Sequence, residues 1–391
     1  MEDADVVLVG YGEIGTKSST VRGKMAARLA SNLRALLADR GFDATVEAEW
    51  PRLYVRTARP GAAADAVAEA PGVVLARPAR ECEPTLPSIR EALCHAARDH
   101  GDGSFAVRAR RHGDGHGFTS GDIEREGGAA LVEATDAPVD LDDPDVTYRV
   151  EVRGDRAVVS SRTADGPGGL PLGTHDRAVA LISGGIDSPV AAWEMMRRGC
   201  AVTPVYVDLG DYGGADHRAR AVETVRRLAS RAPDRDMDLR VISMGEVVAD
   251  LVDTVADTRM LSLRRAMLCA AAVVADEVGA HSLVTGESLG QKSSQTGRNI
   301  AVTDTAVDYP VHRPLVTRDK KDVVALAREL GTFEDATLPV GCERIAPPHP
   351  ETNGSIEAVR AAEPDDLLDR AAAAAADRYS IDVDSGASSR P

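Results

Sequence analysis

The most constraining feature of this chain is a short apolar run that leads directly into a loop of small residues and then into a helical stretch. Residues 178–182 are AVALI, residues 183–188 are SGGIDS, and a helical pattern follows from residue 191. Apolar runs without polar alternation are typical of strands buried on both faces of a parallel sheet. Glycines let the backbone approach a ligand, and N–H groups at a helix start bind anions. The segment therefore predicts a phosphate-binding turn, with an ordinary glycine-rich turn as the alternative.

Three side chains give this loop chemistry beyond that of a simple anion site. Ser183 and Ser188 can add hydroxyl donors. Asp187 would repel a phosphate, so we expect it to hold a magnesium ion or to orient the reacting group. The sequence contains no Gly-x-x-x-x-Gly-Lys motif, which excludes the nucleotide loop of the kinases and GTPases.

Similar apolar runs recur downstream and alternate with helical stretches, which predicts an α/β domain with a parallel sheet covered on both faces. Upstream, a strand at 6–9, a helix capped by Thr20 and a strand at 53–55 predict a small α+β unit, and a second mixed unit follows. Residues 165–173 are rich in glycine and proline and mark a linker. We expect two α+β domains over 1–60 and 61–165, a linker over 166–176, the nucleotide domain over 177–350, and a C-terminal helix and disordered tail over 351–391.

Charge limits the functions that this chain can have. The net charge of the 391 residues is −16, and five of the 46 basic residues are lysines, a composition associated with a high-salt cytoplasm. Such a surface does not favour polyanions, so a nucleic-acid site would have to be a local arginine patch. The best candidates are Arg108, Arg110, Arg111 and Arg125, and a solvated arginine-rich face is the alternative. All the lysines lie in segments that carry other functional signals: Lys17, Lys24, Lys292, Lys320 and Lys321.

The five cysteines are odd in number and lack metal-ligand spacing, which argues against a disulfide scaffold or a zinc site. Cys342, in a loop between Gly341 and Glu343, is the candidate for a reactive thiol, and a small core residue is the alternative. Cys269 lies in a helical pattern, where burial is expected. The sequence has no apolar run of membrane-spanning length and no cleavable leader, so we expect a cytoplasmic protein.

Residues 183–188 resemble the pyrophosphate loop of the N-type ATP pyrophosphatases, which split ATP into AMP and pyrophosphate. With residues 285–296 (TGESLGQKSSQT), 312–321 (HRPLVTRDKK) and 339–343 (PVGCE), the loop closely resembles the tRNA 4-thiouridine synthetases, or tRNA sulfurtransferases. Residues 11–22 resemble the N-terminal ferredoxin-like domain of that family. Residues 104–111 and 118–125 resemble its THUMP domain, a tRNA-binding module.

The resemblance implies a mechanism in which a uridine of tRNA, at position 8 in that family, is adenylated at its C4 oxygen. A persulfide on Cys342 then delivers sulfur to that carbon. Asp187 and Lys320 have catalytic roles, Cys269 is the candidate resolving thiol, and the four arginines contact tRNA. ATP with Mg²⁺ is the implied cofactor pair, and no metal site made by protein alone is expected. The implied ATP contacts are Leu181, Ile182, Ser183, Gly184, Gly185, Ser188, Val205, Tyr206, Arg264, Gly286 and Gln295.

Some members of that family carry a C-terminal rhodanese domain, and we expect none here, because only a low-complexity tail follows Cys342. A cysteine desulfurase or free sulfide would then supply the sulfur. The resemblance also implies a link to the thiazole of thiamine, and a homodimer is left open. Two other readings remain: an amidating or small-molecule ATP pyrophosphatase, and a non-catalytic tRNA-binding protein.

Overall fold

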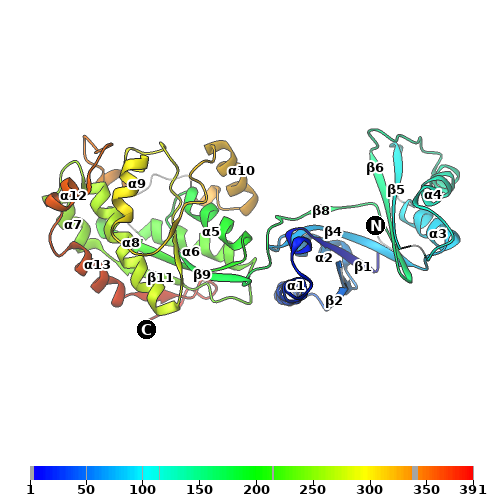
Figure 1. The fold of residues 1–391 in the computed structure, drawn as a ribbon, viewed down its shortest axis with the longest axis horizontal. Coiled ribbons are helices and arrows are strands. Elements are labelled where there is room, and N and C mark those ends of the chain that lie inside the picture. The colour runs from blue at the N-terminus through cyan, green and yellow to red at the C-terminus, as the bar shows by residue number, and fades with distance from the viewer. Residues whose placement is uncertain are drawn as a thin grey trace. The chain divides into compact units, whose positions relative to one another are not determined.

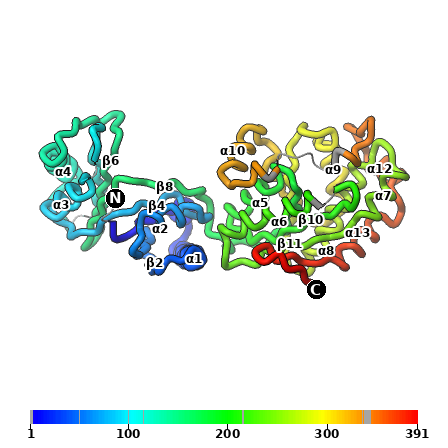
Figure 2. The backbone as a smooth tube through the Cα atoms, turned by 180° about the vertical axis from the view of Figure 1, so that it is seen from behind, coloured from blue at the N-terminus to red at the C-terminus, as the bar shows by residue number. Residues whose placement is uncertain are grey.

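The computed structural model describes residues 4–49, 51–98, 100–113, 115–213, 215–336 and 342–390. The chain divides into two compact units, Met1–Pro171 and Leu172–Pro391 (Figures 1 and 2). The division falls inside residues 166–176, where the sequence predicts a linker. Each unit has its own sheet and its own hydrophobic clusters, and the finer five-part domain division stays a prediction.

The first unit is built on one sheet with the strand order β2-β3-β1-β4-β7-β6-β5, to which β8 adds by pairing with β4. The long strand β4 joins two halves, because its first residues pair with β1 and its last residues pair with β7. Helices α1 and α2 pack on the β1–β4 half, and α3 and α4 pack on the β5–β7 half (Figure 1). The elements are β1 (Val6–Tyr11), η1 (Glu13–Thr16), α1 (Ser19–Asp39), β2 (Ala44–Glu49), β3 (Arg52–Thr57), α2 (Pro60–Ala68), β4 (Val73–Cys82), α3 (Leu86–Ala96), β5 (Phe105–His112), α4 (Ser120–Thr135), β6 (Val146–Arg153), β7 (Arg156–Ser160) and β8 (Ala164–Asp165).

Two local details of this unit differ from the sequence prediction. Helix α1 begins at Ser19, with Ser18 in the N-cap position, so Thr20 already lies inside the helix. Strand β2 was not expected, because Val46 is its only buried side chain and no apolar pattern marks it. Its pairing with β3 supplies the stability that its own sequence lacks.

The second unit has a sheet with the order β13-β12-β9-β10-β11-β14-β15. Strands β13, β12, β9, β10 and β11 are parallel, as the apolar runs predict. Alternate residues of β9 enter different cores: Ala178 and Ala180 face a cluster that includes α5, α6 and α10, whereas Val179 faces a cluster that includes α7, α8 and α13. Helices therefore cover both faces, and the carboxyl ends of the parallel strands share one edge.

The elements of the second unit are β9 (His175–Leu181), α5 (Asp187–Arg197), β10 (Cys200–Asp208), η2 (Gly210–Tyr212), α6 (Ala215–Ala229), β11 (Leu239–Ser243), α7 (Gly245–Thr254), α8 (Arg259–Val278), β12 (Ser282–Val284), η3 (Ser293–Gln295), α9 (Gly297–Asp304), β13 (Val311–His312), α10 (Lys320–Leu330), η4 (Glu334–Ala336), α11 (Cys342–Ile345), α12 (Ile356–Ala362), α13 (Leu367–Ala376), β14 (Tyr379–Ile381) and β15 (Ser388–Ser389).

The C-terminal segment differs from the disordered tail that the sequence predicts. Strand β14 pairs antiparallel with β11, and β15 pairs with β14. The edge of β11 would otherwise leave backbone N–H and C=O groups unpaired, and β14 satisfies them while burying Ile381. Composition could not predict this strand, because the partner edge supplies the reason for it.

Among the described residues, none of the helices is both long enough and apolar enough to span a membrane.

Candidate functional site

The loop between β9 and α5 is a closed turn held by its two serines. The backbone N–H of Ser183 donates to Ser188 Oγ over 2.8 Å, and Gly185 N–H donates to Ser183 Oγ over 3.3 Å. The two hydroxyls lie 3.1 Å apart. These serines therefore shape the loop, a role that the sequence analysis did not assign to them. A preformed turn at the start of an eleven-residue helix presents backbone N–H groups suited to a phosphate.

A second loop packs against this turn at Gly286. A Cβ on Gly286 would lie 2.7 Å from the backbone nitrogen of Ser188 and 2.8 Å from the carbonyl carbon of Asp187. Only glycine permits this approach, because the contacts are to backbone that cannot move aside. The segment after β12 is thereby joined directly to the loop of residues 183–188.

Asp187 and Lys320 form an ion pair beside this loop. Lys320 Nζ lies 2.7 Å from Asp187 Oδ1, and Gln291 Nε2 donates to Asp187 Oδ2 over 3.3 Å. Lys320 is the first residue of α10, and Asp187 is the first residue of α5. The structure thus brings together two residues predicted to be catalytic and adds Gln291, which the sequence analysis did not single out.

Arg264 is held by a buried carboxylate of the segment that follows Gly286. Its guanidinium pairs with Glu287, which also accepts from Arg313 Nε over 2.7 Å and from Thr285 Oγ1 over 3.0 Å. Burial would raise the pKa of Glu287, but Arg264 and Arg313 outweigh it and hold the pKa below its usual value. Glu287 therefore stays ionised in a site that excludes most water.

The remaining predicted ATP contacts lie around the same edge of the sheet. Leu181 ends β9 in register with Val205 of β10, and Ile182 N–H donates to Val205 O over 2.7 Å. The side chains of Ile182, Val205 and Tyr206 belong to the hydrophobic core, and the backbone of Val205 and Tyr206 pairs with β11. Gln295, in η3, accepts from Gly290 N–H over 3.0 Å through its backbone carbonyl. The loop glycines Gly184 and Gly185 complete the set.

Helix α6 contributes an arginine that the sequence analysis missed. A Cβ on Gly184 would lie 3.6 Å from Cβ and 3.7 Å from Cδ of Arg220, so the stem of this arginine runs along the loop. Arg218, two positions earlier in α6, contacts Asp208 Oδ2 and the Tyr379 hydroxyl over 3.5 and 3.1 Å. Neither position has a local signal, because arginines recur along the polar face of α6.

The structure describes the side chains of four of the five cysteines, and Cys342 is the exception. Cys342 begins α11, but its side chain and residues 337–341 lie outside the described part, so its reactivity and its disulfide with Cys269 stay predictions. The Cys269 thiol donates to Leu368 O over 3.4 Å. Burial raises the pKa of Cys269 and Cys200, and raises that of Cys82 to about 11.

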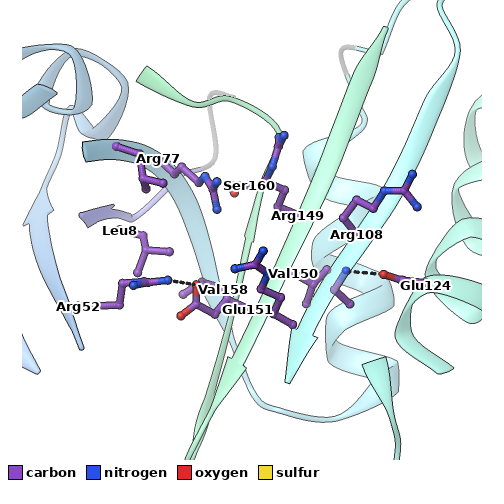
Figure 3. Close-up of a pocket in the computed structure, with 13 residues that line it drawn as sticks. Leu8, Arg52, Arg77, Arg108, Glu124, Arg149, Val150, Glu151, Val158 and Ser160 are labelled. Carbon is purple, nitrogen blue, oxygen red and sulfur yellow. Dashed lines mark hydrogen bonds and ion pairs between the residues drawn. The ribbon is translucent and has the colours of Figure 1, made fainter. Parts of the chain in front are cut away.

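The first unit contains an arginine-lined pocket of about 490 Å³ on the face of its sheet opposite the helices (Figure 3). Strand alternation creates it, because Arg108 and Arg149 project away from the cluster that buries Val107, Tyr148 and Val150. Burial lowers the pKa of Arg77, and the neighbouring Arg149 lowers it further. A bound anion would relieve this repulsion. The arginines that line the pocket are Arg52, Arg77, Arg108, Arg110 and Arg149.

The predicted arginine patch is divided by this geometry. Arg108 and Arg110 line the pocket, whereas Arg111 and Arg125 do not. Arg111 alternates to the other face of β5 and bonds to Gly113 O, and Arg125 pairs with Asp122 over 2.6 Å. Arg52, Arg77 and Arg149 were missed. The alternation of residues 146–153 is the signal that could have identified Arg149.

Glutamates moderate the charge of the pocket. Glu151 pairs with Arg52 over 3.2 Å, and Glu124 accepts from the backbone N–H of Ala109 over 2.9 Å (Figure 3). Glu151 also pairs with Arg153 over 3.5 Å. The bond from Ala109 to Glu124 satisfies a backbone N–H on the open edge of β5, so Glu124 also has a structural role there.

Family models match nearly the whole chain. The model described as thiamine biosynthesis protein (ThiI) matches residues 173–367, the THUMP domain matches residues 86–162, and the ThiI ferredoxin-like domain matches residues 6–76. These matches agree with the resemblance that the motifs carry.

Named relatives and solved structures point the same way. A probable tRNA sulfurtransferase of Halobacterium salinarum is 52% identical over 97% of this chain and 98% of its own length. That of Aeropyrum pernix is 40% identical over 89% of each chain. A crystal structure of a 4-thiouridine synthetase–RNA complex with bound ATP is 26% identical, has a TM-score of 0.83, and is matched over 95% of this chain and 98% of that one. A Pyrococcus horikoshii structure shares the fold, with a TM-score of 0.67, 23% identity, and coverage of 84% of this chain and 99% of that one. The predicted family and fold class are confirmed: the chain belongs to the tRNA sulfurtransferases.

Proposed function

We propose that this protein is an ATP-dependent tRNA sulfurtransferase that makes 4-thiouridine at position 8 of tRNA. The observation that carries the proposal is the Asp187–Lys320 pair beside the preformed loop at the start of α5. Relatives of up to 52% identity are named tRNA sulfurtransferases, and the similar solved structure is a 4-thiouridine synthetase with RNA and ATP.

In the first step, ATP phosphates lie against backbone N–H groups of residues 183–188 other than those of Ser183 and Gly185, which donate within the turn. The uracil C4 oxygen attacks the α-phosphorus, and pyrophosphate leaves. Negative charge grows on the departing phosphate, and Lys320 offsets it where such an interaction lowers the barrier. Arg264 and Arg220 contribute further positive charge near the loop, and Leu181, Ile182, Val205 and Tyr206 are the proposed contacts to the nucleoside.

Asp187 is the residue that would hold Mg²⁺. When bound, this ion would neutralise part of the negative charge of the triphosphate. The fit is reasonable, because Mg²⁺ with nucleotides commonly uses one or two carboxylates and keeps several waters. Among the described residues no group of three potential metal ligands is clustered.

In the second step, the terminal sulfur of a persulfide on Cys342 attacks C4, and AMP leaves. Attack of the Cys269 thiol on the Cys342 sulfur then breaks the sulfur–sulfur bond, releases 4-thiouridine and leaves a disulfide. A cellular thiol must reduce that disulfide before the next cycle. The persulfide is renewed by a cysteine desulfurase or another sulfur donor, and the same persulfide would serve the thiamine thiazole.

Binding of tRNA is assigned to the first unit. The five pocket arginines provide the local positive charge that an acidic chain needs for a polyanion, and Arg111 and Arg125 lie outside this pocket. We place the reaction in the cytoplasm, where ATP and tRNA occur together, and a homodimer is compatible with the proposal.

The test is a reconstitution. Purified protein, ATP, unmodified tRNA, a cysteine desulfurase with cysteine, and a thiol reductant should yield 4-thiouridine, AMP and pyrophosphate, measured by mass spectrometry of the digested nucleosides and by pyrophosphate release. An amidated product, or tRNA binding with no ATP turnover, would overturn the proposal in favour of another ATP pyrophosphatase or a non-catalytic binder.

A further inference from the structure

Glu287 lies beside the nucleotide loop, and no step of the proposed mechanism uses it. Its side chain is 7% exposed, and it accepts bonds from three groups: Arg264, Arg313 and the Thr285 hydroxyl. A carboxylate buried to this degree is retained only where its partners compensate the lost hydration.

The backbone next to Glu287 is locked to the phosphate loop. Gly286 lies so close to Asp187 and Ser188 that a Cβ there would come within 2.7 Å of the Ser188 nitrogen and 2.8 Å of the Asp187 carbonyl carbon. Glu287 is therefore fixed relative to the loop through one peptide unit. Any group that Glu287 orients is oriented relative to the loop as well.

The two arginines on Glu287 are not equivalent. Arg313 has a second carboxylate partner, since its terminal nitrogens contact Asp304 over 2.5 and 3.1 Å. Within the described part of the chain, Glu287 is the carboxylate with which Arg264 pairs, and the Nε of Arg264 is buried without a hydrogen-bond partner. Arg313 is thus held from both ends, whereas the orientation of Arg264 depends on Glu287.

We propose that Glu287 is a positioning residue of the nucleotide site, which holds the Arg264 guanidinium beside the phosphate loop so that it meets bound ATP. The proposal rests on the proposed function, because it assumes that ATP binds at residues 183–188. Loss of the Glu287 charge would leave Arg264 and Arg313 to repel each other, and Arg264 would turn away from the loop.

Glu287→Gln tests this inference, because the amide keeps the volume of the side chain and removes its charge. We expect the KM for ATP to rise about 10-fold, with kcat changed less than about 3-fold and the affinity for tRNA unchanged. In an Arg264→Met background, which already lacks the guanidinium, adding Glu287→Gln should change the KM for ATP less than about 2-fold.

The chain offers a matched control on the next residue of α8. Arg265 pairs with the buried Glu363 over 3.1 Å and contacts Thr305. Glu363→Gln removes a comparable buried carboxylate, so it should lower the melting temperature and leave the KM for ATP unchanged. Thr285→Val, which removes one bond to Glu287, is a milder second variant, with an expected rise of about 3-fold in KM.

The possible outcomes distinguish failure of the proposed function from failure of the positioning role. Wild-type protein that binds no ATP refutes the proposed function. Wild-type protein that binds ATP, with a Glu287→Gln variant of unchanged KM, refutes the positioning role alone. The positioning role is also refuted if Glu287→Gln raises the KM for ATP by the same factor in the Arg264→Met background as in the wild type. It is refuted as well if Glu363→Gln raises this KM as much as Glu287→Gln does, because either result indicates a general structural role.

Discussion

The ammonium of Lys320 lies 2.7 Å from a carboxylate oxygen of Asp187, although the two residues are 133 positions apart. Their helices, α10 and α5, begin side by side as a result, and both charges lie at the loop proposed to bind ATP phosphates. A charge pair of this kind at a helix start can offset charge on a reacting phosphate and orient the metal that accompanies it.

Lys320→Met should lower kcat/KM for AMP formation at least about 100-fold, because it removes positive charge where negative charge develops. Asp187→Asn should have a similar effect, and tRNA affinity should stay the same in both. Lys321→Met is the matched control, since Lys321 is 79% exposed and lies 4.0 Å from Asp319. Near-normal turnover by Lys320→Met, measured by pyrophosphate release, contradicts a catalytic role.

Gly286→Ala should abolish ATP binding. Its Cβ would press on the backbone of Asp187 and Ser188 and displace the loop. Gly297→Ala is the control, because an added Cβ there meets nothing within 4 Å. Calorimetry with a non-hydrolysable ATP analogue measures the affinity of each variant. Equal affinities of the two variants would show that the close packing at Gly286 does not matter for nucleotide binding.

Arg77→Ala and Arg149→Ala should each weaken tRNA binding and reduce the slope of log K against log salt by about 1, as expected for the loss of one phosphate contact. ATP affinity should not change. Arg162→Ala serves as control, because Arg162 pairs with Asp65 on an exposed surface and does not line the pocket. Filter binding over a salt series measures the effect, and identical slopes for all three variants would remove the pocket from the RNA site.

Alkylation should distinguish the cysteines at pH 8. With a pKa of about 11, Cys82 is a thiolate in about one molecule in a thousand at that pH, and the raised pKa of Cys200 and Cys269 slows them also. Peptide mass spectrometry after brief iodoacetamide treatment should find Cys342 labelled first. Labelling of Cys82 ahead of Cys342 would count against the reactive role of Cys342.

The capping box of α4 predicts a pH-dependent contribution to stability. Hydrogen bonds from the Thr119 backbone, then Arg125, lower the pKa of Asp122 to about 2, below the 3.8 of the free group. A depressed folded-state pKa stabilises the fold above about pH 4, and this contribution is lost as the pH falls toward 2. Urea unfolding should therefore show Asp122→Asn to be less stable than wild type at pH 7, with a difference that shrinks below pH 4. A difference independent of pH would exclude this cause.

Much of the second unit was predictable because its signals are local. The apolar run of residues 178–182, the glycines after it and the helical pattern that follows depend on neighbours within a few positions, and they predict strand, turn and helix correctly. The pairing of β14 with β11 was not predictable, because residues 379–381 form a strand only where a sheet edge is open to them.

The sequence by itself determined the family, the parallel-sheet fold and the identity of the residues most suited to chemistry, since each rests on residue types at short spacing. Only the tertiary structure decided which of them meet. It placed Lys320 on Asp187, Glu287 between Arg264 and Arg313, and Arg77 beside Arg149, and it left Arg111 and Arg125 outside the pocket. Strand order decides which helices and loops become neighbours, and the face to which each strand residue points decides which strand side chains meet. Both are settled by long-range pairing, which no short stretch of sequence contains. The loop of residues 183–188 is thus encoded locally, whereas the charges around it come from distant parts of the chain.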